Sequence, residues 1–124
     1  MFADTKAYSG LAVKDLQEAR KFYGETLGLR ISEQHDQIWL HLAGGRDTLV
    51  YHQPDATPAS YTTLNFEVDD IDEAVDALTA RGVTLERYDG IEQDDRGISR
   101  AAEGPYIAWF KDPAGNVLSV LQEP

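Results

Sequence analysis

Three side chains in this chain of 124 residues could carry acid–base or metal chemistry: His41, His52 and Glu67. Imidazole and carboxylate groups can give and take protons during a reaction, so the three could supply a general acid and a general base. Two imidazoles and one carboxylate are also a common ligand set for divalent metals. Each of these roles requires a fold that brings the three groups together.

The two histidines are expected on neighbouring strands of one hairpin. Alternating apolar and polar residues predict strands at 37–42 and 48–52, with Gly44-Gly45-Arg46-Asp47 as the turn between them. If Ala43 pairs with Thr48 across that turn, directly opposite residues point to the same side of the sheet. One face of the hairpin then carries Trp39, His41, Val50 and His52.

A strand at 62–68 is expected to set Glu67 among other polar groups. Its apolar residues alternate with Thr63, Asn65 and Glu67, so these three face away from the core. A carboxylate in a cavity walled by aromatic rings could serve as a base or could bind a cation in its charged form. We therefore expect an aromatic or cationic ligand, with these aromatic residues as its candidate contacts: Tyr8, Trp39 and Tyr106.

The chain contains an internal repeat. Residues 11–19 match residues 66–74 at an offset of 55 positions, with Val, Asp, Glu and Ala coinciding. In each copy an Asp precedes an amphipathic segment and a Glu follows three residues later, which is typical of a helix start. Glycines at 28 and 82 are expected to end the two helices. Gly24 lies inside the first helix and indicates close packing there.

The expected order of elements is βαβββ, twice, in an α+β fold. We expect one domain, 1–124, made of module 1 (about 7–53) and module 2 (about 62–122) with a linker at 54–61. Helices are expected after Asp15 and after Asp70. Besides the three strands above, alternation and turn residues predict strands at 7–13, 30–35, 84–88, 106–111 and 117–122.

A long Gly-containing stretch at 89–104 has no periodicity, and loops of that length in small domains are usually functional or mobile. We expect it to be a lid. Within it, Glu92-Gln93-Asp94-Asp95-Arg96 is expected to be a solvated charge run. Arg100, in the same stretch, is a candidate ligand contact through an anionic group, or a partner for Glu103.

Composition excludes several classes of protein. The chain has 11 basic and 22 acidic residues, a formal net charge of −11, which disfavours nucleic acid and anionic membrane surfaces as partners. There is no cysteine, which excludes disulfides and thiolate sites and is consistent with a reducing compartment. No run of residues is apolar enough for a membrane span. We expect a soluble, unprocessed, cytoplasmic protein.

The repeat, the stretch Gly10-Leu11-Ala12-Val13-Lys14-Asp15-Leu16 and the terminal Phe110-Lys111-Asp112-Pro113-Ala114-Gly115-Asn116 resemble the vicinal oxygen chelate superfamily. That group includes glyoxalase I, bleomycin-resistance proteins and extradiol dioxygenases. The resemblance covers essentially the whole chain. It implies paired βαβββ modules whose sheets curl around a cavity, and a homodimer.

Enzymes of this superfamily bind a divalent metal through His, Glu or Gln on equivalent strands of the two modules. Counted from the shared motifs, three of those positions are Tyr8, Thr63 and Ser119, and a fourth falls near Val50 or His52. Three of the four are not usual ligands, so we expect no metal cofactor. Thr63 and Ser119 then join Asn65 as candidate ligand contacts, and a displaced divalent metal on His41, His52 and Glu67 stays the alternative.

Two functions follow from this resemblance. The favoured one is a metal-independent small-molecule binding protein of the bleomycin-resistance type. The alternative is an enzyme of the same superfamily, a lyase, isomerase or dioxygenase-like protein, that uses Glu67 with His41 or His52 as acid and base or as a metal site.

Overall fold

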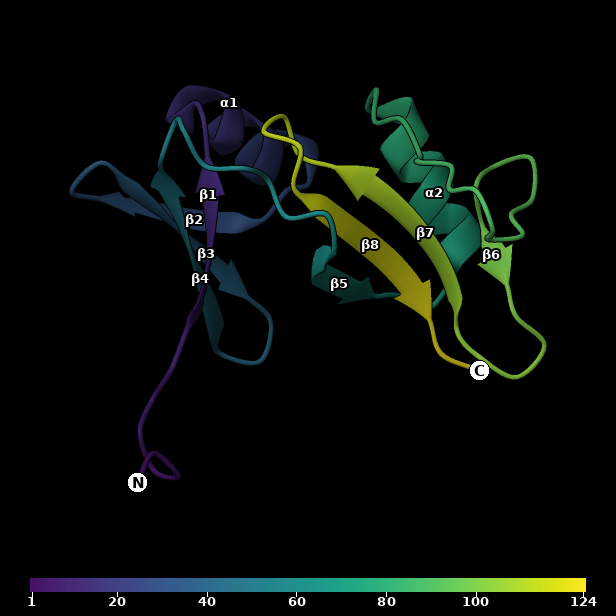
Figure 1. Ribbon diagram of the computed structural model, residues 1–124, viewed down its shortest axis with the longest axis horizontal. Helices are drawn as coiled ribbons and strands as arrows, with labels where there is room; N and C mark the ends of the chain where they lie inside the picture. The colour runs from purple at the N-terminus through teal and green to yellow at the C-terminus, as the bar shows by residue number, and fades with distance from the viewer. The chain divides into compact units, whose positions relative to one another are not determined.

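The computed structural model describes all 124 residues, and the chain divides into two compact units, Met1–Thr57 and Pro58–Pro124. Each unit contains a four-stranded sheet with its helical segment against one face (Figure 1). Both units follow the βαβββ order that the repeat predicts, and the α+β class is confirmed. No helix is long and apolar enough to cross a membrane.

Unit 1 holds the first sheet, whose strand order is β1-β4-β3-β2. β1 runs parallel to β4, and the other neighbours are antiparallel. A short helix follows β1 and continues directly into a π-helical turn. The elements are β1 (Ser9–Val13), α1 (Leu16–Arg20), η1 (Lys21–Thr26), β2 (Arg30–Gln34), β3 (Gln37–Leu42) and β4 (Arg46–His52).

The first helix begins and ends where its residue types predict. The Asp15 carboxylate accepts hydrogen bonds from the backbone N–H groups of Gln17 (2.9 Å) and Glu18 (3.2 Å), which satisfies two free donors of the first turn. Gly24 packs closely, as expected, because a Cβ there would lie 2.9 Å from Cδ1 of Ile31. Gly28 ends the segment with a φ of +71°, a conformation that side chains disfavour.

The core of unit 1 lies between the helical segment and one face of the sheet. Alternate strand residues point to that face, as the period of two requires, and the helix contributes Ala19, Phe22 and Tyr23. The buried strand residues are Leu11, Val13, Ile38, Leu40, Thr48 and Val50. We call this the helix side of the sheet and the opposite face its open side.

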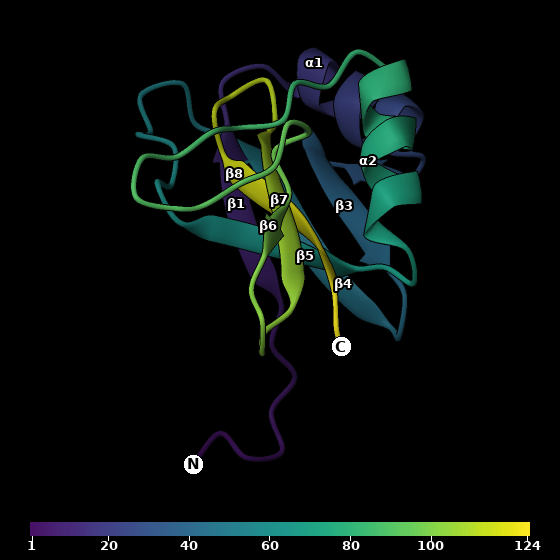
Figure 2. The same ribbon diagram turned by 90° about the vertical axis from the view of Figure 1, so that its right-hand side faces the viewer.

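Unit 2 holds the second sheet, in the order β5-β8-β7-β6, with β5 parallel to β8. Helix α2 lies along one face of this sheet, against β7 and β8, in the two views of Figures 1 and 2. The elements are β5 (Thr62–Glu67), α2 (Ile71–Ala80), β6 (Ser99–Arg100), β7 (Tyr106–Lys111) and β8 (Val117–Gln122).

The predicted strand at 84–88 is wrong. That segment has no regular structure and reaches β7 through a hydrogen bond from the N–H of Glu86 to the carbonyl of Trp109 (2.7 Å). The edge position beside β7 belongs to Ser99 and Arg100, which pair with Ile107 and Tyr106. The alternating pattern at 84–88 therefore reflects packing along β7 without a continuous ladder.

Helix α2 is fixed at its first turn from two directions. Asp70 caps it by accepting from the N–H of Glu73 (3.1 Å), and Gln122 of β8 accepts from the N–H of Ile71 (2.9 Å). Its apolar stripe covers the helix side of the sheet. The buried residues there are Ile71, Val75, Leu78, Ala108, Phe110, Leu118 and Val120.

The turn between β7 and β8 is built around Asp112. Its carboxylate accepts from the N–H groups of Ala114 (2.9 Å) and Asn116 (2.8 Å) and from the Asn116 amide (2.9 Å). Gly115 takes a φ of +96°, and a Cβ there would lie 3.1 Å from Cγ of Pro58. These contacts fix the point at which β8 begins.

Candidate functional site

An aromatic pair lies on the open side of the unit 1 sheet. The register between β1 and β4 places Gly10 and Ala12 on the face opposite to that of the buried Leu11 and Val13, and Tyr8, which precedes β1, continues the alternation. The Tyr8 ring meets the Trp39 ring edge to face, with centroids 4.7 Å apart and an interplanar angle of 74°. Tyr8 keeps 63% of its surface exposed. The pair is thus accessible to a ligand in unit 1.

The register predicted for the β3–β4 hairpin is wrong. Leu42 pairs with Arg46, which leaves a three-residue loop in which Gly44 and Gly45 have φ of +83° and +71°. The expected pairing of Ala43 with Thr48 differs from this register by an odd number of positions. Such a shift moves one strand's residues to the other face.

This register separates the two candidate histidines. Trp39 and His41 lie on the open side, opposite Leu49 and Asp47, whereas Val50 and His52 point to the helix side with Leu11 and Val13. His41 and His52 therefore cannot act as a pair, either as acid and base or as two ligands of one metal ion.

His41 instead lies between two polar side chains of unit 1. Its Nε2 is 2.7 Å from Oγ of Ser32, and its Nδ1 is 3.0 Å from Oδ1 of Asp47. Ser32 is on β2 and Asp47 is on β4, so the three groups come from adjacent strands. No sequence motif links Ser32 and Asp47 to His41.

On the open side of the unit 2 sheet, the candidate polar residues lie close together. Asn65 Oδ1 accepts from Oγ of Ser119 at 2.7 Å, and Ser119 is fully buried. Glu67 belongs to the same face by register and is exposed at the end of β5. Thr63 lies at an irregularity of the strand, and its hydroxyl donates to the carbonyl of Val117 (2.9 Å).

Two aromatic residues, Trp109 and Tyr88, accompany this polar group. Trp109 pairs with Ser119 and so shares its face, and the ring of Tyr88 packs edge to face against it at 5.6 Å. Burial and the neighbouring carboxylate of Glu86 raise the pKa of the Tyr88 hydroxyl. A phenol with a raised pKa stays neutral and can donate a hydrogen bond at neutral pH.

Tyr106 and Arg100 do not lie where they were expected. In the β7–β8 register Tyr106 is opposite Gln122, whose side chain binds the start of α2, so Tyr106 is on the helix side. Arg100 pairs with Tyr106 across β6 and β7, and its guanidinium lies 5.1 Å from the centre of that ring. Neither residue joins Asn65, Glu67 and Ser119 on the open side.

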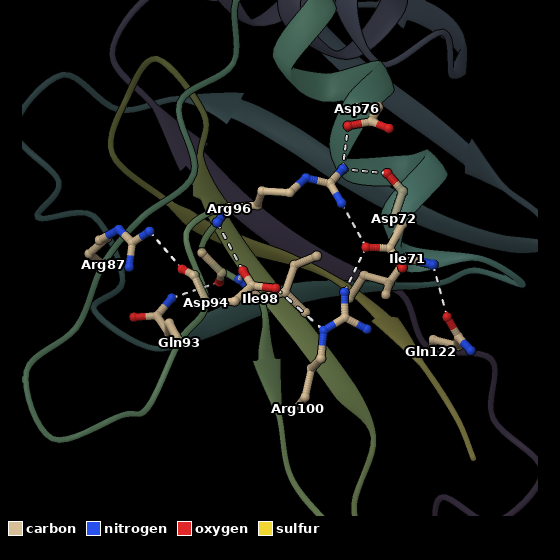
Figure 3. Close-up of polar contacts among 11 residues, drawn as sticks. Ile71, Asp72, Asp76, Arg87, Gln93, Asp94, Arg96, Ile98, Arg100 and Gln122 are labelled. Atoms are coloured by element: carbon tan, nitrogen blue, oxygen red, sulfur yellow. Dashed lines mark hydrogen bonds and ion pairs between the residues drawn. The ribbon is translucent and has the colours of Figure 1, made fainter.

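Arg100 belongs to an ionic cluster that joins the 92–100 segment to α2 (Figure 3). Asp72 of α2 accepts from Arg96 and from Arg100, each at 2.6 Å. Arg96 also pairs with Asp76, and Arg100 with Asp94 at 3.3 Å. Arg100 thus forms its ion pairs with Asp72 and Asp94 and not with Glu103, while its contact with a ligand stays a prediction.

Asp94 stabilises the 92–100 segment through hydrogen bonds to its backbone. Its carboxylate accepts from the N–H groups of Arg96 and Ile98, both at 2.9 Å. Partial burial acts to raise the pKa of the Asp94 carboxyl, but these hydrogen bonds, together with Arg100, outweigh it and hold that pKa below its usual value. The charge run at 92–96 is therefore more than a solvated face.

Further contacts hold part of the 89–104 segment, the expected lid, in place. Gln93 bridges the segment to the preceding chain by donating to the carbonyls of Glu86 (3.0 Å) and Gly97 (2.7 Å). Ile98, which no pattern singled out, is fully buried. Residues 93–100 are thus held against the rest of unit 2.

Two surface depressions flank the cluster, each of about 430 Å³. One lies between α2 and the chain at 83–87 and 95–97. The other is lined by Glu92, Gln93, Asp94, Ile98, Ser99, Arg100 and Ala101. Of the predicted ligand residues, only Arg100 borders either one.

The donor set expected at the metal positions does not fit a divalent metal. Tyr8, Thr63 and Ser119 offer neutral hydroxyl groups, and the β4 residues that share the face of Tyr8 are Asp47, Leu49 and Tyr51 rather than His52. Divalent metals in proteins are held by imidazole, carboxylate or thiolate ligands. In neither unit do three such side chains converge in a way that could hold a metal ion.

Comparison with solved structures shows the same fold throughout the chain. The chain is similar to the fosfomycin resistance protein FosX from Listeria monocytogenes, with 14% identity over 98% of this chain and 94% of that one and a TM-score of 0.75. It is similar to TnmS3, an antibiotic binding protein from Streptomyces sp. CB03234, with 22% identity over 98% of both chains and a TM-score of 0.70.

A lactoylglutathione lyase from Agrobacterium tumefaciens has 21% identity over 97% of this chain and 95% of that one, with a TM-score of 0.69. No curated protein matches the sequence. The model of the Glyoxalase/Bleomycin resistance protein/Dioxygenase superfamily matches residues 6–120, in agreement with the repeat and the two βαβββ units. The chain belongs to this superfamily.

Proposed function

We propose that the chain is a small-molecule binding protein that holds an aromatic or cationic ligand without a metal ion. The observation that carries the proposal is the Tyr8–Trp39 pair on the open side of unit 1, in which Tyr8 is exposed and Trp39 is half-buried. An aromatic pair with one ring largely free offers a ready surface for stacking. A ring or a cation placed against Trp39 gains stacking or cation–π energy of about 0.5–2 kcal/mol.

Electrostatics favour a cation over an anion. The chain has a formal net charge of −11, and Glu67 adds an exposed carboxylate on the open side of unit 2. A field of one sign attracts ligands of the other sign and speeds their association. We therefore place cationic polycyclic molecules first among the ligands to be tested.

Metal independence follows from the donor set. The hydroxyl groups of Tyr8, Thr63 and Ser119 are poor ligands for a divalent ion, and those of Thr63 and Ser119 already donate to Val117 and Asn65. Asn65 and Ser119 already bond to each other, so they present a fixed polar group. Stacking and hydrogen bonding would replace coordination in holding the ligand.

The relatives contain both binding proteins and enzymes, and TnmS3, described as an antibiotic binding protein, is the precedent for the binding role. The opposite faces of His41 and His52 exclude only their joint use, so an enzyme that uses Glu67 with one of them stays the alternative. We also propose that the protein is cytoplasmic and forms a homodimer. Light scattering would test the dimer.

The test is a titration with cationic and polycyclic antibiotics, in which binding is measured by thermal shift and by tryptophan fluorescence. Replacing Trp109 by Phe leaves Trp39 as the only indole, so quenching reports on the unit 1 face. Tyr8→Ala should weaken binding by about tenfold, the loss of one stacking contact. Tyr61→Ala is the matched control, because Tyr61 is similarly exposed, at 71%, and belongs to unit 2.

Two results would contradict the proposal. The first is the absence of thermal stabilisation by any compound in the panel at concentrations far above the usual range of Kd. The second is equal weakening by Tyr8→Ala and Tyr61→Ala, which would separate binding from the aromatic pair. Stoichiometric metal in protein purified without chelator would refute metal independence alone.

A further inference from the structure

Ser32, His41 and Asp47 have the mutual geometry of a nucleophile, a base and an orienting acid. The Oγ of Ser32 lies 2.7 Å from Nε2 of His41, and Oδ1 of Asp47 lies 3.0 Å from Nδ1 of the same ring. We propose that these residues form a nucleophilic triad that hydrolyses carboxylic esters. The proposal concerns other residues than the Tyr8–Trp39 pair, so it does not rest on the binding function.

The hydrogen-bonding roles follow from chemistry. An ionised carboxylate can only accept a hydrogen bond, so Nδ1 of His41 must carry a proton and donate it in the hydrogen bond to Asp47. In a neutral imidazole the other nitrogen is then an acceptor, and the Ser32 hydroxyl donates to it. This is the tautomer in which a histidine can remove the proton of a serine nucleophile.

The register of three adjacent strands fixes this arrangement. His41 pairs with Arg30 of β2 on one side and with Asp47 of β4 on the other, and Ser32 is the diagonal neighbour of His41 on the same face. β2, β3 and β4 are consecutive in the sheet (Figure 1). Groups held on strands keep their spacing better than groups on loops.

The sheet also offers donors for the negative charge of the reaction. β2 is an edge strand, and the two-residue turn at His35 and Asp36 makes Gln34 and Gln37 a hydrogen-bonded pair. Hydrogen-bonded and non-hydrogen-bonded pairs alternate along the two strands from that pair. The backbone N–H groups of Ile31 and Glu33, on either side of Ser32, therefore point away from β3, towards the unpaired edge of the sheet. An N–H next to the nucleophile can stabilise an oxyanion.

The reaction balances with water as the only co-reactant. The Oγ of Ser32 forms a bond to the carbonyl carbon, and its proton passes to Nε2 of His41. The ester bond breaks, and the leaving alcohol takes that proton, which leaves the acyl group on Ser32. A water molecule then gives its proton to Nε2 and attacks the acyl carbon. The acid is released, and Oγ recovers the proton.

The exposure of the triad to solvent limits the rate that it can reach. The side chains of His41 and Asp47 are 41% and 48% exposed, so water weakens their electrostatic coupling. We expect slow turnover and little discrimination among small activated esters. General-base catalysis of this kind contributes about 10²–10⁴-fold.

The experiment uses p-nitrophenyl acetate as substrate and a fluorophosphonate probe as a label for an activated serine. The unmodified chain should show a burst of p-nitrophenol and should be acylated and phosphonylated at Ser32, as located by peptide mass spectrometry. Ser32→Ala and His41→Gln should each lower kcat by about 100-fold. His52→Gln is the matched control and should leave kcat unchanged, because His52 faces the helix side.

Asp47 is a positioning residue in this scheme. Asp47→Asn keeps a group of the same shape beside Nδ1 but removes the charge that stabilises the protonated ring. This substitution should lower kcat by at least about tenfold and leave KM unchanged. Hydrolysis that persists in Ser32→Ala would show that a lone imidazole is responsible and would overturn the triad. Absence of any label on Ser32 in the folded, unmodified chain would overturn it as well.

Discussion

The two units have the same strand order and differ in where they hold their polar networks. Unit 1 places Ser32, His41 and Asp47 on the open side of its sheet, whereas unit 2 places its ionic cluster beside α2 on the helix side. Charge differs too: unit 1 has eight acidic and six basic residues, and unit 2 has fourteen and five.

The difference shows that one topology can be specialised in two ways. In unit 1 tight hairpins leave the open side free for reactive or stacking side chains. In unit 2 the chain between α2 and β6 is long, and the cluster around Asp72 and Asp94 holds that segment in place. Function therefore has to be argued from each face and not from the repeat.

The largest effect should come from the core of either unit. Phe110 of unit 2 and Leu40 of unit 1 are 1% and 0% exposed. Phe110→Ala should cost about 3–5 kcal/mol and Leu40→Ala about 2–5 kcal/mol, because each leaves a cavity as well as losing buried surface. Urea unfolding, followed by Trp109 or Trp39 in single-tryptophan variants, measures both. A cost below about 1 kcal/mol would contradict the assigned core.

A smaller effect is expected from the cluster that distinguishes unit 2. Asp72→Ala removes the acceptor shared by Arg96 and Arg100 and should cost about 1–2 kcal/mol, a range reduced because these side chains are more than a third exposed. Amide exchange at Gly97 and Ile98 should speed up. Arg20→Ala, which removes the pair with Glu33 in unit 1, is the control and should leave exchange at both sites unchanged.

The helix caps test what the two units share. Asp15→Ala and Asp70→Ala each remove a carboxylate that satisfies first-turn N–H groups, and each should cost about 1 kcal/mol. Chemical denaturation gives the two values. A large difference between them would show that one helix start depends on other contacts, such as that of Gln122 with Ile71.

The smallest effect concerns pH. Because the pKa of Asp94 is lowered in the folded chain, its contribution to stability is present above the ordinary carboxyl range. It is lost as the pH falls below about 4, towards the folded pKa. Asp94→Asn should therefore flatten the fall of Tm between about pH 5 and pH 2.5. Parallel Tm curves for the two proteins would contradict this assignment.

Local signals in the sequence predicted most of the fold. The cap residues Asp15 and Asp70 and the terminating Gly28 and Gly82 act within a few positions, and each takes the expected role or backbone conformation. Strands 37–42, 106–111 and 117–122 have the predicted bounds, because their alternation is long enough to be distinct. β6 is two residues long, too short for any pattern to show.

The candidate site was harder to predict because it depends on register and on faces. Trp39 and His41 were placed on one face correctly, but their cross-strand neighbours were wrong, since the loop length between Leu42 and Arg46 was unknown. β7 carries apolar residues on both faces, so alternation could not orient Tyr106. Ser32 and Asp47 are ordinary polar residues in sequence, and only the three-strand register brings them to His41.

The three-residue loop at 43–45 has a consequence for how this family member can change over time. A register shift of one residue at this hairpin would exchange the buried and exposed sets of a whole strand, whereas a shift of two would preserve them. A change of loop length that keeps Leu42 opposite Arg46 leaves both sets in place. Insertions and deletions should therefore be tolerated at residues 43–45 as long as that pairing is kept.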